Sequence, residues 1–205
     1  MDAQPIESIA VVLYDGFDEL DAIGPYEVFA TAADHGAGFD VSLRTLDPVE
    51  RVTASHGTVV EPEGPLDGTD PDLVVVPGGG WNDRAGRGAW AQSLGALPDE
   101  LARRHQNGTT IAAVCTGGMI LATAGLLDGR PATTHHGALA DLRETDANVV
   151  DARVVDDGDV LTAGGITSGI DLALWLVERE VGADVAETVA TELEYDRSGE
   201  IHRST

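Results

Sequence analysis

The chain contains one cysteine, and its position suits nucleophilic chemistry. Cys115 follows the apolar run at residues 110–114 and precedes Thr116 and a helical pattern, which predicts a strand-to-helix turn. The first N–H groups of a helix lack intrahelical partners and carry the positive end of its dipole, so they stabilise a thiolate. We therefore expect Cys115 to be a nucleophile with a pKa below the usual value of about 8.5. The alternative is that Cys115 only packs as a small apolar residue.

A glycine-rich turn is a second candidate element of this site. The run Leu-Val-Val-Val at residues 73–76 predicts a strand buried on both faces of a parallel sheet, and Gly78, Gly79 and Gly80 follow it. Glycines just past such a strand let backbone N–H groups approach a ligand. Together with the N–H of Thr116 they would form an oxyanion hole. Taken alone, the same pattern is also typical of a plain turn.

Asp21 is a third candidate, because it is a carboxylate in an apolar stretch. It follows the first predicted strand, residues 9–14, and its neighbours are Leu20, Ala22 and Ile23. A carboxyl group buried beside a thiol has a raised pKa and holds a proton that it can deliver. Acidic residues are also common in the first turn of a helix, where the dipole favours them.

Four segments carry a resemblance to a known family: residues 20–29, 74–80, 113–136 and 161–182. In this order and spacing they resemble the ThiJ/PfpI superfamily, whose fold is that of class I glutamine amidotransferases, and within it the isonitrile hydratase branch. The resemblance implies a single domain over residues 1–205. It implies an α/β fold, a flavodoxin-like three-layer sandwich with a mostly parallel central sheet, helices on both faces and a nucleophile elbow at Cys115.

The resemblance also implies roles for individual residues. Cys115 would be the nucleophile, Asp21 the partner acid, and Thr116 and Gly79 the backbone donors of the site. Four further residues are expected to bind substrate: Gly78, Gly80, Gly117 and His135. His135 is included because it ends the next predicted strand, and the carboxyl ends of such strands meet at one rim of the sheet; a histidine that is simply hydrogen-bonded there is the other interpretation. We expect no metal and no cofactor.

The implied reaction adds water to the terminal carbon of an isonitrile and releases an N-substituted formamide. Peptidase-like members have a histidine directly after the nucleophile, where this chain has Thr116, so the pattern argues against proteolysis. One alternative is a glyoxalase- or deglycase-like enzyme acting on α-oxoaldehydes, although such members tend to have Glu at the position of Asp21. Another is a non-enzymatic redox-sensing stress protein whose thiol is oxidised. The chain departs from the hydratase-like pattern at His136 and after Tyr195.

Charge restricts the partners of this chain. It has 36 acidic and 12 basic residues, all of the latter arginine, and a formal net charge of −24. Such a field repels phosphates and anionic membranes, so we expect neither nucleic acid nor membrane as a partner. Acidity without lysine indicates a halophilic protein, because molar salt shortens the Debye length to about 3 Å and screens the repulsion. A bacterial protein with an acidic patch is the simpler alternative.

Other sequence features predict the location and assembly of the protein. No segment approaches the roughly 20 apolar residues of a membrane span, and residues 1–5 lack a basic or apolar signal region. One cysteine allows no internal disulfide, which fits a reducing cytoplasm. We expect a cytoplasmic protein with a small-molecule substrate, and the resemblance implies a homodimer.

The remaining elements follow from periodicity. We predict an amphipathic helix at residues 88–107, with Leu94, Leu97 and Leu101 inward and Glu100, Arg103 and Arg104 outward. Residues 167–181 form a helix too apolar for the surface. The other predicted elements are strands at 39–46 and 132–135, a hairpin at 52–62, a short helix at 138–144, and a hairpin pairing 149–155 with 160–163.

Overall fold

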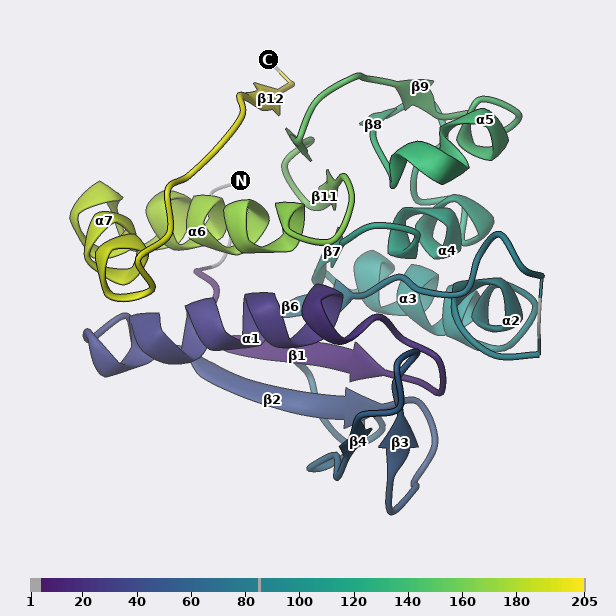
Figure 1. Ribbon diagram of the computed structural model, residues 1–205, viewed down its shortest axis with the longest axis horizontal. Coiled ribbons are helices and arrows are strands. Elements are labelled where there is room, and N and C mark those ends of the chain that lie inside the picture. The colour runs from purple at the N-terminus through teal and green to yellow at the C-terminus, as the bar shows by residue number, and fades with distance from the viewer. Residues whose placement is uncertain (1–4, 85, 205) are drawn as a thin grey trace.

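Strands with almost no polar residues form the centre of the structure, a computed structural model that describes residues 5–84 and 86–204 (Figure 1). Residues 1–4, on which the expectation about export partly rests, lie outside the described residues, as do residues 85 and 205. Eight strands form one sheet in the order β12-β10-β11-β7-β6-β1-β2-β5. Their bounds are β1 (Ser8–Leu13), β2 (Asp40–Thr45), β5 (Gly64–Pro65), β6 (Leu73–Val76), β7 (Thr110–Ala113), β10 (Val154–Asp156), β11 (Val160–Ala163) and β12 (Ile201–Arg203).

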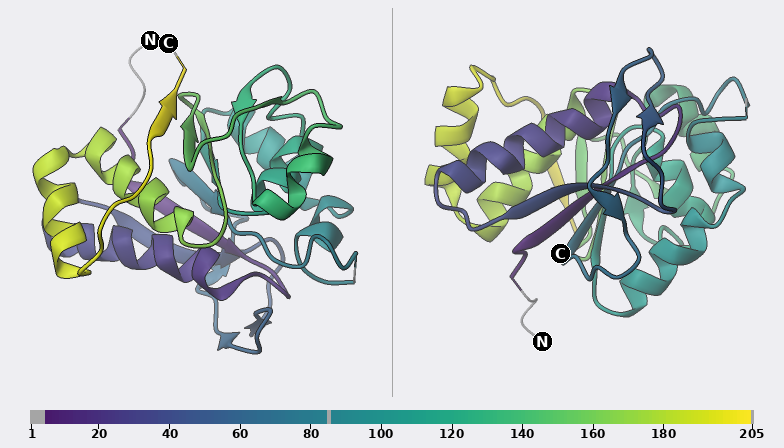
Figure 2. Two further views of the ribbon diagram at one scale, coloured as in Figure 1. Left: turned by 45° about the horizontal axis from the view of Figure 1, so that its top comes forward. Right: turned by 90° about the horizontal axis from the view of Figure 1, so that it is seen from below.

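All neighbouring strands in this sheet run parallel except β10 and β11, which are antiparallel. Every residue of β6 and β11 is buried, as expected where helices cover both faces of a sheet. One face carries α1 (Glu19–Asp34), α6 (Ser168–Glu180) and α7 (Ala183–Glu192), and the other carries α2 (Ala89–Ser93), α3 (Leu97–Gln106) and α4 (Gly117–Thr123) (Figure 2). The predicted three-layer α/β sandwich is confirmed.

Smaller elements lie at the margins. The strands β3 (Val52–Thr53) and β4 (Val59–Val60) form the predicted hairpin, and β8 (Pro131–Ala132) pairs with β9 (Asn148–Val149). A 3-10 turn (His136–Ala138) precedes α5 (Leu139–Leu142). Within the described residues, no helix is long and apolar enough to cross a membrane.

The predicted helix at 88–107 is wrong in detail, because it is two helices, α2 and α3. Leu94, predicted to face inward, lies between them and is 72% exposed. Arg104, predicted to face outward, is only 3% exposed. Its guanidinium donates hydrogen bonds to the carbonyl oxygens of Leu66 (2.8 Å) and Thr69 (2.9 Å), and these bonds offset the desolvation of a buried charge.

Two strand predictions also change. Only residues 131–132 of the segment predicted around 132–135 are in a strand, and the predicted hairpin is shorter, since β10 begins at Val154 while Val149 belongs to β9. The helix α7 and the strand β12 were not predicted. β12 pairs with β10 at the edge of the sheet, a contact between segments far apart in the chain that local periodicity does not reveal.

Candidate active site

Cys115 lies in a sharp turn between β7 and α4. Its φ angle is +56°, in the left-handed region that non-glycine residues rarely adopt. Its N–H donates to the carbonyl oxygens of Gly164 (2.9 Å) and Ala163 (3.2 Å) in the turn after β11. The predicted nucleophile elbow is therefore present, and the neighbouring strand end helps to hold its strained backbone.

Gly117 makes this elbow sterically possible. A Cβ atom at this position would lie 2.2 Å from the carbonyl oxygen of Val76 and 2.8 Å from that of Pro77, so only glycine lets α4 begin against the end of β6. The structure thus gives Gly117 a packing role, and its expected contact with substrate stays a prediction. Gly80 also has a packing role, because a Cβ there would lie 3.1 Å from the carbonyl oxygen of Arg87, while its expected contact with substrate stays a prediction. The absence of a side chain at Gly80 lets the turn after β6 approach the segment at residues 87–88.

Asp21 reaches the same place from the first turn of α1, a helix that Asp18 caps by accepting a hydrogen bond from the N–H of Leu20 (3.2 Å). The side chain of Asp21 is completely buried. Its Oδ2 accepts a hydrogen bond from the N–H of Gly78 (3.0 Å), and its Oδ1 is a buried oxygen with no hydrogen-bond partner among the described residues. A proton on Oδ1 would remove the penalty of leaving this acceptor unpaired.

Burial, followed by the charge of Asp18, raises the pKa of Asp21 to about 7, although interactions with the Gly78 N–H and the Cys115 thiol oppose this rise. The predicted rise is confirmed in direction. The carboxyl group exchanges its proton near neutral pH, which suits a group that accepts and delivers protons during a reaction.

The prediction of a lowered thiol pKa is wrong. Cys115 is 6% exposed, and burial, together with the carboxylate of Asp21, raises the pKa of its thiol above the ordinary value. The backbone N–H groups of Ile166 and Thr116 favour the thiolate but do not outweigh these effects. The sequence locates the helix start but does not show that the sulfur is enclosed beside a carboxyl group. In the resting protein Cys115 is a neutral thiol, so attack requires a base that takes its proton.

The predicted oxyanion hole is not preformed. The N–H of Thr116 acts on the sulfur of Cys115, and the N–H of Gly79 donates to Oγ1 of Thr116 (2.9 Å). Both groups therefore have partners inside the protein. At Gly78 a Cβ would lie 2.4 Å from the backbone nitrogen of Thr116, so the absence of a side chain brings this turn against the nucleophile. Gly78 serves the site by donating its N–H to Asp21.

His135 lies near the turn after β11, against Gly165. A Cβ on Gly165 would be 2.7 Å from Cδ2 of His135, and the ring packs against that of His136 with centroids 4.1 Å apart and planes tilted by 40°. Its Nδ1 accepts a hydrogen bond from the N–H of Gly137 (3.1 Å). Burial and then the neighbouring His136 lower the pKa of His135, so the imidazole is neutral at pH 7.

Two site residues were missed by the sequence analysis. Thr134 donates its hydroxyl hydrogen to the carbonyl oxygen of Cys115 (2.7 Å) and so fixes the elbow. The buried phenol of Tyr14 donates to the carbonyl oxygen of Pro77 (2.5 Å) and holds the glycine turn. Tyr14 ends the first predicted strand, and the position of a polar group at a strand end was the available signal.

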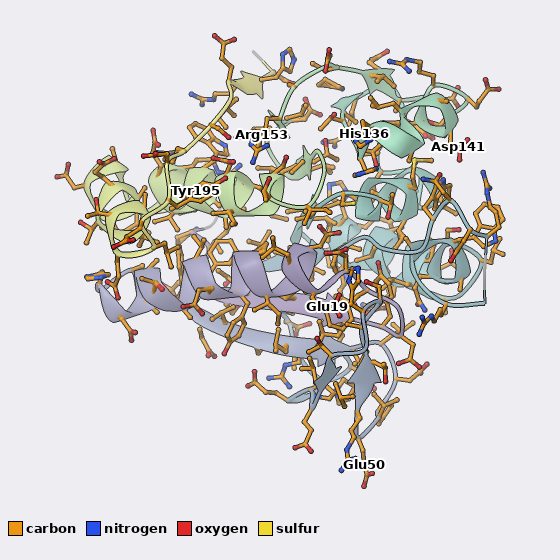
Figure 3. The ribbon with its side chains drawn as sticks, in the orientation of Figure 1. Glu19, Glu50, His136, Asp141, Arg153 and Tyr195 are labelled. Atoms are coloured by element: carbon orange, nitrogen blue, oxygen red, sulfur yellow. The ribbon has the colours of Figure 1, made fainter. Side chains whose placement is uncertain are left out.

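Asp18, Glu19 and His56 are the one group of described residues whose spacing suits a metal ion, with ligand atoms within 4.8 Å of one another. The carboxylate of Glu19 already accepts hydrogen bonds from the hydroxyl of Ser55 (3.1 Å) and from the backbone N–H of His56 (2.9 Å). Although burial opposes it, bonding to His56 and Ser55 lowers the pKa of Glu19 to about 2. Glu19 thus ties the β3–β4 hairpin to the start of α1, near its label in Figure 3.

Comparison with known proteins shows which family has this sequence pattern. The sequence profile of the DJ-1/PfpI family matches residues 7–179, a span that includes both Asp21 and Cys115. The chain belongs to the DJ-1/PfpI family. The isonitrile hydratase of Pseudomonas putida is 39% identical over 189 residues, which are 91% of this chain and 78% of that protein.

Solved structures of the DJ-1/PfpI family share the fold. A ThiJ/PfpI family protein from Pseudomonas syringae superposes with a TM-score of 0.83 at 28% identity, covering 94% of this chain and 76% of that one. DJ-1beta from Drosophila melanogaster gives a TM-score of 0.80 at 26% identity, covering 93% and 99%. These matches confirm the flavodoxin-like architecture that the sequence predicts.

Proposed function

We propose that this protein is an isonitrile hydratase, which adds water to the terminal carbon of an isonitrile through Cys115 and Asp21. One observation carries the proposal: a completely buried carboxyl group with a pKa of about 7 and an unpaired Oδ1 lies beside the thiol. The 39% identical relative named isonitrile hydratase supports the same substrate class.

In the first half of the reaction Asp21 takes the proton from the thiol of Cys115 as the sulfur attacks. A carbon–sulfur bond forms at the terminal carbon of the isonitrile, and Asp21 passes the proton to that carbon. The product is a thioimidate on Cys115, and the carboxyl group is left ionised. No oxyanion develops in this step, so the engagement of the Gly79 N–H by Thr116 does not hinder it.

In the second half the ionised Asp21 acts as a general base toward water. Asp21 takes a proton from the water as the water oxygen bonds to the thioimidate carbon, and passes this proton to the nitrogen of the substrate. The carbon–sulfur bond then breaks, the proton of the new hydroxyl moves through Asp21 to the sulfur, and an N-substituted formamide is released. One isonitrile and one water give one formamide, and Asp21 ends in its starting protonation state.

The test is to incubate the purified protein in molar KCl with an alkyl isonitrile and to quantify the formamide by chromatography. We expect turnover that Cys115→Ala abolishes. Cys115→Ser is a second, closely matched variant, since it nearly keeps the size of the side chain but replaces the thiol with a hydroxyl, a far weaker nucleophile, and it should be equally inactive. Formamide production no faster than with Cys115→Ala would refute the proposal.

The same experiment, run with methylglyoxal, tests the glyoxalase- or deglycase-like alternative. Asp21→Glu creates the carboxylate typical of those members, and a gain on methylglyoxal with a loss on isonitrile would identify this residue as the determinant of substrate class. The redox-sensing alternative is disfavoured by the raised pKa of Cys115, because the thiolate is the species that reacts with oxidants in that chemistry.

A further inference from the structure

A network of three side chains, centred on a buried carboxylate, joins three segments that are distant in sequence. Asp171, in the first turn of α6, is 2% exposed. Its Oδ2 accepts hydrogen bonds from Nε of Arg153 (2.6 Å) and from the hydroxyl of Tyr195 (2.8 Å). Its Oδ1 accepts one from the N–H of Ser198 (3.0 Å). We call Arg153, Asp171 and Tyr195 the clamp; Arg153 and Tyr195 lie on the same side of α6 in Figure 3.

The clamp holds the turn at residues 164–167, which joins β11 to α6. Nη2 of Arg153 donates to Oγ1 of Thr167 (3.0 Å), and the backbone oxygen of Arg153 accepts from the N–H of Gly164 (2.9 Å). Both ends of the turn are therefore bonded to one arginine. The tail keeps that arginine in place, since a Cβ on Gly199 would lie 2.8 Å from its Cδ.

This turn contacts the nucleophile twice. The carbonyl oxygen of Gly164 accepts from the N–H of Cys115 (2.9 Å), and the N–H of Ile166 acts on its sulfur. Ile166 has a φ angle of +36°, which is strained for a β-branched residue. Such a conformation persists only where surrounding structure imposes it. The clamp supplies bonds on both sides of Ile166.

We propose that Arg153, Asp171 and Tyr195 are positioning residues for Cys115, which hold the turn at 164–167 in the strained form that presents the Ile166 N–H to the sulfur. The inference rests on the proposed role of Cys115 as the nucleophile. An N–H directed at sulfur favours the thiolate. When the clamp is weakened, Ile166 relaxes, its N–H moves away, and both thiolate formation and attack become slower.

The test compares two mild variants with a matched control. Tyr195→Phe removes one hydroxyl from the clamp, and Thr167→Val removes the hydrogen bond that the Arg153 side chain donates to the turn. The control is Arg197→Gln, in the same tail segment as Tyr195. It breaks an ion pair with Glu178 of α6 (2.6 Å) but removes no bond to the turn at 164–167. Alkylation of Cys115 by iodoacetamide is measured from pH 6 to 10, and isonitrile turnover is measured in parallel.

We expect the clamp variants to be alkylated about tenfold more slowly at each pH from 6 to 10, because loss of one hydrogen bond to the thiolate raises the pKa of the Cys115 thiol further. Their kcat should fall by a similar factor with little change in KM, while Arg197→Gln behaves as the unmodified protein. If the clamp variants lose thermal stability but are alkylated at the same rate as the unmodified protein at every pH, the clamp has only a structural role and the inference is overturned. Faster alkylation would overturn it too.

A double variant distinguishes relief of the backbone strain at Ile166 from a general loss of order in the turn. Glycine adopts a positive φ angle without penalty, so Ile166→Gly needs no clamp to keep the turn in its present form. We expect Tyr195→Phe to slow alkylation much less in the Ile166→Gly background than in the unmodified protein; an equal effect in both backgrounds contradicts the mechanism. If the alkylation results hold while no isonitrile is turned over, the clamp stands and the proposed substrate fails.

Discussion

Asp21→Asn should make the protein more stable at neutral and alkaline pH and nearly inactive. The substitution keeps the shape of the side chain and an oxygen that accepts the hydrogen bond from the Gly78 N–H (3.0 Å). It removes the carboxyl group whose pKa rises from the ordinary value of 3.8 to about 7 on burial. At about 1.4 kcal/mol for each pH unit, this rise corresponds to about 4 kcal/mol of destabilisation above pH 7.

The sign follows from proton binding by the two states. Below about pH 4 both states hold the proton on Asp21, and the group imposes no penalty on the fold. Between about pH 4 and 7 the unfolded chain loses its proton while the folded protein keeps it, so the free energy of unfolding decreases as the pH rises. Asparagine does not titrate. The advantage of Asp21→Asn therefore grows across this window and is constant above it.

The assay is urea unfolding of both proteins in molar KCl at pH 5, 6, 7 and 8, with isonitrile turnover measured on the same samples. The difference in the free energy of unfolding should increase by about 2 to 3 kcal/mol between pH 5 and pH 8. Turnover should fall by about 10²–10⁴-fold, as for loss of a general acid. A stability difference independent of pH would refute the assigned titration of Asp21, and near-normal turnover would refute its catalytic role.

Three further predictions follow from charge and packing. The melting temperature should rise steeply between low and molar KCl, because screening reduces repulsion among 36 acidic residues facing 12 arginines, and a flat profile would contradict the halophilic interpretation. Gly117→Ala should lower the free energy of unfolding by at least about 1–3 kcal/mol, as measured by urea unfolding, because the added Cβ would lie 2.2 Å from the carbonyl oxygen of Val76. Cys115→Ala should leave the melting temperature within a few degrees of the unmodified value while turnover disappears; extensive unfolding would show that the thiol is required for packing.

The sequence identified three of the residues that meet at the site. Asp21 follows β1, Gly78 follows β6 and Cys115 follows β7, and these three strands are neighbours in the sheet. The carboxyl ends of adjacent parallel strands lie at one edge, so the motif positions account for this convergence once the structure gives the order of the strands. The raised pKa of Asp21 was predictable for a related reason, because its neighbours in sequence are apolar and imply burial.

Tertiary structure alone decided the state of the thiol and the contacts that hold it. Whether a helix start lowers or burial raises the pKa of Cys115 depends on what encloses the sulfur, and Asp21 and Ile166 enclose it from distant parts of the chain. The inward position of Arg104 likewise depends on carbonyl groups of another loop, which no periodicity within α3 can reveal. The clamp joins residues 153, 171 and 195, whose proximity arises only when β10, α6 and the tail pack together. Local pattern determines which elements form and which ends they share, whereas desolvation and long-range hydrogen bonding depend on the packed neighbours of each group.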